Sequence, residues 1–242
     1  MNSKTIKELF GKSIDFQGLS EKARLAVTKE YKKKESSGIF AVRVTLDGLI
    51  AILPDRFREN IENTNEKTSY QLDLSASFLR THFVINNLIL TGDIIEALTL
   101  IRKQLENLTR LIEIDEKPLS KIEKKTPNVC NILTAAGKKL YRELSEVAHF
   151  GTPRVGNLLR TNILTENKTG PSVYPIFSET LFEVYKQHSF ISIYFLFWIL
   201  GFLKSVYKEK YDSTYDDKIL ESIFEKAVLE KIIILDLEDD LK

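Results

Sequence analysis

Apolar residues recur along most of the chain at intervals of three and four, which is the period of an amphipathic α-helix. The clearest case is a 4-3-4-3-4 spacing within residues 94–114, formed by Ile94, Leu98, Ile101, Leu105, Leu108 and Ile112. A second helix is expected from Gln71 to about Leu90. The short break Thr91-Gly92-Asp93 between them predicts an antiparallel helical hairpin, with Asp93 as the cap of its second helix.

The other segments also favour helix. We expect a short amphipathic helix over residues 3–16, a second from an N-cap at Ser20 to about Lys34, and further helices over residues 178–211 and from residue 212 onward. Ile39 to Leu53 is apolar and partly β-branched, so helix and strand compete there. Helix is favoured because no partner strand is near. The sequence therefore predicts an all-α protein with a helical-bundle core.

Residues 151–177 interrupt this pattern with several glycines and prolines. Asn157 to Thr165 and Val173 to Phe177 allow a short β-hairpin, and the alternative is an irregular insertion. Long ordered loops beside a site are often functional, and this one follows His149 directly. We therefore expect it to lie close to the histidine.

A polar stretch over residues 56–70 is the best internal boundary in the chain. It divides an N-terminal helical segment, residues 1–68, from a helical bundle over residues 69–242. One continuous domain containing both parts is the alternative. The chain has 242 residues, of which 43% are hydrophobic, so either arrangement can bury a sizeable core.

Composition limits which partners, disulfides and metal sites the chain can have. The 35 basic and 34 acidic residues nearly cancel, so no global field attracts nucleic acid, and RNA binding would need a local patch. A single cysteine excludes an internal disulfide and fits a cytoplasmic location. The three histidines have no metal-ligand spacing, so we expect no metal and no cofactor. His82 is expected at the edge of the core, and His188 at an exposed or interfacial position.

An uncharged run of 17 residues, 187–203, lies between Lys186 and Lys204. This length is at the lower limit for a membrane-spanning helix. A buried central helix is the favoured interpretation, because the run contains polar side chains and a large helical core needs one helix that is apolar all round. Association with a membrane is the alternative.

The stretch Lys138 to Thr152, KKLYRELSEVAHFGT, carries the candidate chemistry. We expect a helix from about Pro127 to His149, ending there because Gly151 and Pro153 follow. One side of this helix is apolar and contains Leu140, Tyr141, Leu144, Val147 and Ala148. The other side contains Arg142, Ser145, Glu146 and His149. Arg142 and His149 are almost two turns apart and point the same way.

Arginine and histidine in this arrangement suit phosphate chemistry. Histidine gives and takes protons near neutral pH, and arginine holds a phosphate through a planar, permanently charged fork. Cleavage of RNA through its own 2′-hydroxyl needs a base and a cation but no metal ion. The structural alternative is that Arg142 pairs with Glu146 at i+4 and that His149 caps the helix C-terminus.

A second polar pair, Arg102 and Glu106, flanks the apolar seam of the predicted 94–114 helix. An i,i+4 pair of this kind is often a surface salt bridge. The alternative is a half-buried pair that faces the motif helix. Glu106 would then orient His149 or pair with Arg142.

Arg142 and His149, with six residues between them near the end of a long helix, resemble the motif of the HEPN superfamily. YRELSEVAHFGT is also similar to a Tyr-x-x-Leu-Ser-x-x-x-His signature of bacterial helical proteins, whose preceding hairpin carries an Arg-x-x-x-Glu like that of Arg102 and Glu106. The resemblance implies a homodimer that cleaves RNA without metal. Arg142 would bind the scissile phosphate and His149 would act as general base or acid. The supporting residues would be Arg102, Glu106, Ser145 and Glu146.

The same resemblance implies a biological setting. Such proteins often act as toxins or phage-defence effectors, so an antitoxin or another defence protein is the expected partner. The alternative, from a different class, is a non-catalytic helical interaction or scaffold subunit. A membrane-associated effector that uses residues 187–203 is a third interpretation.

Overall fold

The computed structural model describes residues 3–62, 64–129, 135–159 and 170–234, and these residues confirm the all-α class. No β-strand forms among them. The α-helices are α1 (Ser3–Lys34), α2 (Ser37–Arg56), α3 (Glu66–Thr91), α4 (Ile94–Glu116), α5 (Leu119–Ile122), α7 (Ala135–Ala148), α8 (Thr180–Tyr207) and α9 (Thr214–Leu229). Two 3-10 helices, η1 (Pro153–Leu159) and η2 (Lys208–Lys210), follow α7 and α8.

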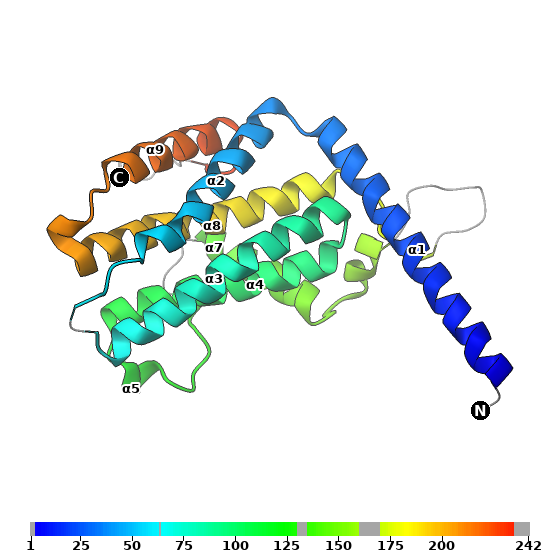
Figure 1. The fold of residues 1–242 in the computed structure, drawn as a ribbon, viewed down its shortest axis with the longest axis horizontal. Helices are drawn as coiled ribbons and strands as arrows, with labels where there is room; N and C mark the ends of the chain where they lie inside the picture. Colours follow the sequence, from blue (N-terminus) through cyan, green and yellow to red (C-terminus); the bar gives the residue numbers. More distant parts are fainter. Residues whose placement is uncertain (1–2, 63, 130–134, 160–169, 235–242) are drawn as a thin grey trace.

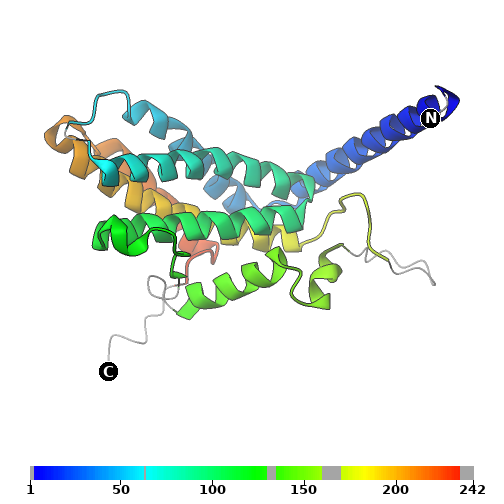
Figure 2. The ribbon, with the colours of Figure 1, turned by 90° about the horizontal axis from the view of Figure 1, so that it is seen from below.

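Helix α8 lies at the centre of the bundle and contacts α2, α3, α4 and α9 (Figure 1). The predicted hairpin of α3 and α4 packs on one side of it, and α7 packs on α4 (Figure 2). Helices α2 and α9 pack on each other and on α8. The N-terminal part of α1 projects away from the bundle in both views.

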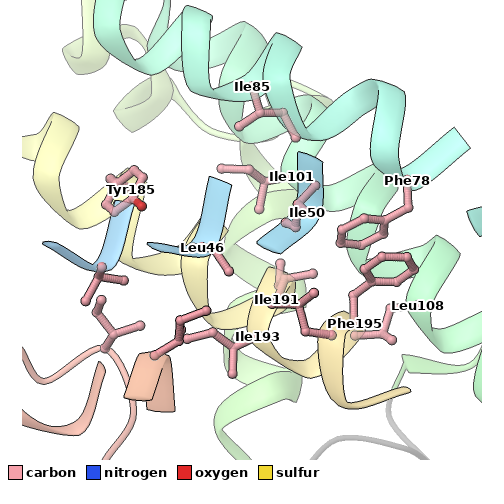
Figure 3. Packing of buried hydrophobic residues seen from close by; sticks show 14 of the residues in the cluster. Leu46, Ile50, Phe78, Ile85, Ile101, Leu108, Tyr185, Ile191, Ile193 and Phe195 are labelled. Carbon is pink, nitrogen blue, oxygen red and sulfur yellow. The ribbon is translucent and has the colours of Figure 1, made fainter. Parts of the chain in front are cut away.

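The core joins helices from both ends of the chain. Phe78 of α3 and Phe195 of α8 stack with ring centroids 3.8 Å apart, and Leu46 of α2 lies in the same cluster (Figure 3). Stacked aromatic pairs stabilise beyond the area that they bury. Because α2 contributes to this cluster, residues before and after residue 68 share one hydrophobic core.

The apolar run 187–203 lies within α8, as predicted for a central helix. By length and composition alone, both α2 and residues 180–210 are long and apolar enough to cross a membrane. The core helix of a soluble protein passes the same test. In the second segment, 56% of the most apolar window is buried inside the bundle.

The turn between α3 and α4 has the predicted glycine, and Asp93 is at the predicted N-cap position, but its side chain makes no capping bond. Gly92 adopts φ 84°, and a Cβ at this position would lie 3.0 Å from Val27. Asp93 precedes α4 without a side-chain bond to the helix. Its carboxylate instead accepts two bonds of 3.0 Å from Arg24 and one of 2.7 Å from Thr91. Asp93 is therefore the N-cap residue of α4, as predicted, and its carbonyl accepts the first helical bond from Ala97 N at 3.0 Å, but its side chain pairs with Arg24 and does not cap the helix.

The predicted break at Ser20 is absent, because α1 runs without interruption from Ser3 to Lys34. The Ser20 hydroxyl accepts a bond of 2.6 Å from Arg24 Nη1 instead of capping a new helix. The segment 39–53 lies within α2, which confirms helix over strand.

The insertion after the motif contains a 3-10 helix over Pro153–Leu159, so residues 157–159 are not a strand. Residues 160–169, which include the rest of the first predicted strand, lie outside the described part of the chain. Residues 173–177, the second predicted strand, are described and form no strand, so the irregular insertion fits the described residues better than the hairpin. A backbone bond of 2.7 Å from Ser172 N to Leu159 O joins the two flanks of the insertion.

Candidate active site

The candidate site lies where α7 packs on α4 (Figure 2). Leu144 of α7 is buried in the core and anchors the contact. Arg102 and Glu106 lie one turn apart on α4, and their side chains are 19% and 26% exposed. Both are thus half-buried at the α7 contact, unlike a pair on an open surface.

The Arg102 guanidinium is the centre of the cluster. Its Nη1 lies 2.7 Å from His149 Nε2. Its Nη2 lies 3.0 Å from Glu106 Oε1 and 3.4 Å from the Tyr141 hydroxyl. The Tyr141 hydroxyl donates to Glu106 Oε1 at 3.0 Å, and the guanidinium carbon lies 5.4 Å from the centre of the Tyr141 ring. Four side chains from two helices therefore share one network.

His149 is held at the C-terminal end of α7. Helical bonding ends in two backbone bonds, from Phe150 N to Val147 O at 3.1 Å and from Gly151 N to Glu146 O at 2.9 Å. This is the Schellman arrangement, which needs a left-handed residue after the cap. Phe150 takes that conformation, with φ 48°. The helix ends where the sequence predicted, but a phenylalanine rather than the neighbouring glycine makes the turn.

The predicted site residues separate into two groups. His149, Arg102 and Glu106 meet, whereas Arg142 is exposed and bonds to none of the described residues. Glu146 accepts a hydrogen bond from Thr152 instead of pairing with Arg142. The Ser145 hydroxyl is buried without a hydrogen-bond partner among the described residues. Glu106 bonds to Arg102 and Tyr141, and Arg102 takes the place beside His149 that the sequence suggested for Glu106.

Charge is balanced inside the cluster and unbalanced at its edge. Burial lowers the pKa of Arg102, but the Tyr141 hydroxyl and the Glu106 carboxylate raise it further, so the net shift is upward and the guanidinium stays charged. Glu106 offsets that charge. Arg142 lies on the same face of α7 as His149, only about 20° around the helix axis, and supplies a cation without a carboxylate partner among the described residues.

Tyr141 is the member of the cluster that sequence analysis missed. Its position in the helical period assigned it to the apolar side of the motif helix, and it is half-buried there. A tyrosine at the border of an apolar face still has a hydroxyl that needs a hydrogen-bond partner. That requirement was the available signal, and Arg102 and Glu106 meet it.

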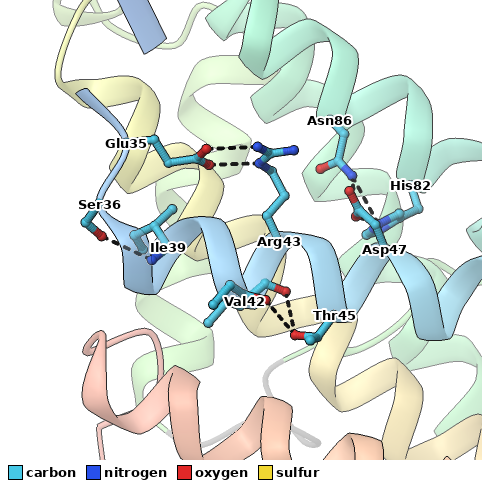
Figure 4. A network of polar contacts seen from close by, with 10 residues as sticks. Glu35, Ser36, Ile39, Val42, Arg43, Thr45, Asp47, His82 and Asn86 are labelled. Atoms are coloured by element: carbon cyan, nitrogen blue, oxygen red, sulfur yellow. Dashed lines mark hydrogen bonds and ion pairs between the residues drawn. The ribbon is translucent and has the colours of Figure 1, made fainter. Parts of the chain in front are cut away.

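A second polar network lies inside the bundle, between α2, α3 and α8 (Figure 4). Asp47 of α2 lies 2.8 Å from His82 Nε2 and accepts a bond of 2.7 Å from Asn86. His82 Nδ1 lies 3.2 Å from the hydroxyl of Ser192. Beside them, Arg43 donates two bonds of 2.8 Å to Glu35. The network ties three helices together.

The order Asp47, His82 and Ser192 has the residue types of a hydrolytic triad. Neither the His82 nor the Ser192 side chain is accessible, since both residues are 0% exposed. A nucleophile must reach its substrate, so this arrangement is a satisfied structural network. Among the described residues, no group of three or more His, Cys, Asp or Glu side chains is placed to hold a metal ion.

His188 is fully buried, so the prediction of an exposed or interfacial position was wrong. Its ring lies 4.6 Å from that of His82, between centroids, and both ring nitrogens lack a hydrogen-bond partner of ordinary geometry among the described residues. Burial, with a further contribution from His82, holds the pKa of His188 well below its usual range. The side chain is thus a neutral imidazole inside the core.

Comparison with known proteins gives no match. No protein-family model fits this chain, and neither a curated protein nor a solved structure is significantly similar to it. The functional argument therefore depends on the geometry of the α4 and α7 contact.

Proposed function

We propose that the protein is a ribonuclease that cleaves RNA without a metal ion at the contact of α4 and α7. The observation that carries this proposal is the 2.7 Å contact between Arg102 Nη1 and His149 Nε2. A guanidinium can only donate, so Nε2 must accept and the imidazole proton must be on Nδ1. In the neutral imidazole this contact leaves the lone pair on Nε2, where a general base needs it.

A phosphate group would change the hydrogen bonds of Arg102. Charge-assisted bonds to a phosphate are stronger than a bond to a neutral imidazole, so a bound phosphodiester draws the guanidinium toward itself and frees His149 Nε2. Arg142, exposed on the same face of α7, binds a second phosphate oxygen. In this proposal, binding of the phosphodiester is the step that frees His149 to act as the base.

The reaction then needs no further group. His149 Nε2 removes the proton from the ribose 2′-hydroxyl, and the 2′-oxygen attacks the phosphorus. The bond from phosphorus to the 5′-oxygen breaks, the leaving oxygen takes up a proton from the imidazolium or from water, and a 2′,3′-cyclic phosphate remains. The two arginines offset the charge that develops on the five-coordinate phosphate.

Tyr141 and Glu106 are positioning residues in this scheme. They hold the Nη2 side of Arg102 while its Nη1 side exchanges His149 for phosphate. The likeness of Arg142 and His149 to the HEPN motif supports the same chemistry. On that likeness we further propose a toxin or phage-defence effector of the cytoplasm.

An RNA cleavage assay in excess EDTA tests the proposal. The wild-type chain should produce fragments that end in 2′,3′-cyclic phosphate, and His149→Ala and Arg142→Ala should each lower the rate by at least 100-fold, the order of a lost general base or charge clamp. Arg58→Ala removes an exposed arginine elsewhere and should leave the rate unchanged. Cleavage that survives in His149→Ala, or a folded wild type that cuts no RNA, would refute a nuclease at this site.

A second candidate function is a non-catalytic scaffold subunit. Glu143 directly follows Arg142 and is exposed, so negative charge adjoins the proposed phosphate site. On this alternative, the bonds of Arg102 join α4 to the end of α7 and serve only stability. It predicts that His149→Ala lowers the melting temperature. It also predicts that neither the wild type nor any variant cleaves or binds RNA.

A further inference from the structure

An exposed aromatic ring directly follows His149. Phe150 is 57% exposed and lies outside the hydrophobic core that the described residues form. His149 and Arg154, on either side of it in the chain, are exposed as well. Figure 2 shows α7 and the following η1 on the outer side of α4. A large apolar ring thus lies in water beside the proposed general base.

The backbone of Phe150 is also unusual for this residue type. Its φ of 48° lies in the left-handed region, which favours glycine over residues that carry a side chain. The next residue, Gly151, is not in that region. The other non-glycine residues that the structure describes with positive φ are lysines, whose charged ends favour water. Neither burial nor backbone preference accounts for a phenylalanine here, and residues held in such conformations cluster at functional sites.

A row of basic side chains on α7 leads to this ring. Lys138, Arg142 and His149 are spaced by four and seven residues, so they lie within about 40° of one another around the helix axis. The rise of the helix separates Lys138 from Arg142 by about 6 Å and Arg142 from His149 by about 10 Å. Lys138 and Arg142 are exposed, and neither pairs with a carboxylate among the described residues. The row therefore offers positive charge over the length of more than one nucleotide.

An aromatic ring at the end of a basic row matches the chemistry of a single strand of nucleic acid. Phosphates bind the cations, and an unpaired base stacks on the ring. In an RNA duplex the bases stack on one another, and the deep, narrow major groove does not admit side chains. A protein partner would instead need a contiguous apolar patch, whereas the exposed residues that flank Phe150 include His149 and Arg154 and no second large apolar side chain. The surroundings of the ring thus favour unpaired RNA over a duplex or a protein.

We propose that Phe150 stacks on an unpaired base and that the substrate is a single strand of RNA, whose backbone follows α7 along Lys138 and Arg142. Consecutive Cα atoms are about 3.8 Å apart, so the stacked base belongs to the nucleotide whose 2′-hydroxyl meets His149 or to its neighbour. Stacking then fixes the position of that ribose beside Nε2. The inference rests on the proposed function for the place of the cleaved bond, and it adds the form of the RNA and the residue that recognises it.

Binding of an RNA that cannot be cut tests the stacking. A single-stranded 2′-O-methyl oligonucleotide lacks the attacking hydroxyl, so its dissociation constant can be measured with the active chain. Phe150→Leu keeps an apolar side chain but removes the flat ring, and it should raise that constant by about fivefold or more, the loss of one stacked base. Phe150→Trp should retain the affinity. Phe10→Leu is the matched control, because Phe10 is 68% exposed on α1, and it should change nothing.

The same oligonucleotide annealed to its complement should bind wild type and Phe150→Leu equally, because its bases are already stacked. Unchanged affinity of Phe150→Leu for the single strand, or an equal loss for the duplex, would overturn the proposal. A change of sedimentation in Phe150→Leu without an effect on RNA would assign the ring to a contact between proteins and equally overturn it.

An abasic scan of a cleavable strand locates the stacked base. Removing the base at one position beside the cleaved bond should slow the wild type by about fivefold or more and Phe150→Leu little, because that variant has already lost the stack. Cleavage without such a position would refute the stacking and leave the proposed function intact. Binding that depends on the Phe150 ring, in a chain that cuts no RNA, would support the stacking and refute the nuclease. A chain that neither binds nor cuts RNA would refute both.

Discussion

Arg102 Nη1 lies 2.7 Å from His149 Nε2 and so joins the middle of α4 to the end of α7 across 47 positions of sequence. The guanidinium also bonds to Glu106 and Tyr141 on its other side. An arginine held in this way determines which nitrogen of the histidine carries the proton. The consequence can be measured without any substrate.

The first prediction concerns the tautomer of His149. Because Nε2 accepts from Arg102, neutral His149 should carry its proton on Nδ1, which is the less common tautomer of a histidine side chain in water. Nitrogen chemical shifts of labelled histidine, recorded in alkaline solution, report this directly. Arg102→Ala should return His149 to the Nε2–H form. An Nε2–H tautomer in the wild type would contradict the observed contact.

The second prediction concerns the Tyr141 hydroxyl, which donates to Glu106 at 3.0 Å. Tyr141→Phe removes this bond and leaves a half-buried carboxylate with one partner fewer, so the free energy of unfolding should fall by about 1 kcal/mol. Denaturant titration measures the change. Tyr215→Phe, at an exposed tyrosine, should change it by less than about 0.5 kcal/mol. Equal changes in the unfolding free energy at the two positions would contradict the hydrogen bond between Tyr141 and Glu106.

Sequence periodicity predicts the helices of the bundle well, because a seam such as Ile94 to Ile112 can be buried only as one face of a helix. It also identifies Arg102, Glu106 and His149 as candidate site residues, with Arg102 and Glu106 either a surface salt bridge or a pair that faces the motif helix. It does not predict which of them meet, since Arg102 and Glu106 are one turn apart and either can reach His149. Whether Arg102 or Glu106 contacts His149 depends on the separation and rotation of α4 and α7, which are set by the packing of the core.

His82 and His188 show a different limit. Each lies in a segment whose period permits burial, but a polar side chain argues against it. Asp47, from a helix distant in sequence, binds His82 and makes its burial favourable. Such long-range compensation has no local signal. The uninterrupted α1 is similar, because the Ser20 hydroxyl binds Arg24 in a rotamer that the sequence does not specify.

The third prediction concerns Phe150, which ends α7 in a left-handed conformation with φ 48°. This conformation costs an L-residue with a side chain roughly 1 kcal/mol relative to glycine. Phe150→Gly should therefore be more stable than Phe150→Ala by about that amount in thermal or chemical unfolding. Both variants lose the same exposed ring, so the difference between their unfolding free energies reports the cost of the left-handed backbone conformation. An alanine variant as stable as the glycine variant would show that residue 150 is not left-handed.

The fourth prediction concerns acid stability. The buried His188 imidazole, beside His82, keeps its pKa well below the ordinary value of about 6.5, so the folded chain leaves it neutral where the unfolded chain binds a proton. The contribution of His188 to the unfolding free energy is therefore fully present above about pH 6.5. Below that pH it falls by up to about 1.4 kcal/mol per pH unit. His188→Leu removes this pH dependence. When the pH is lowered from 7.5 to 5.5, the unfolding free energy of the wild type should therefore fall by roughly 1 kcal/mol more than that of the variant. Taking the difference cancels the contribution of the surface carboxylates far from residue 188 to first order. A pH-independent difference would mean that water or another proton donor reaches the His188 ring in the folded state.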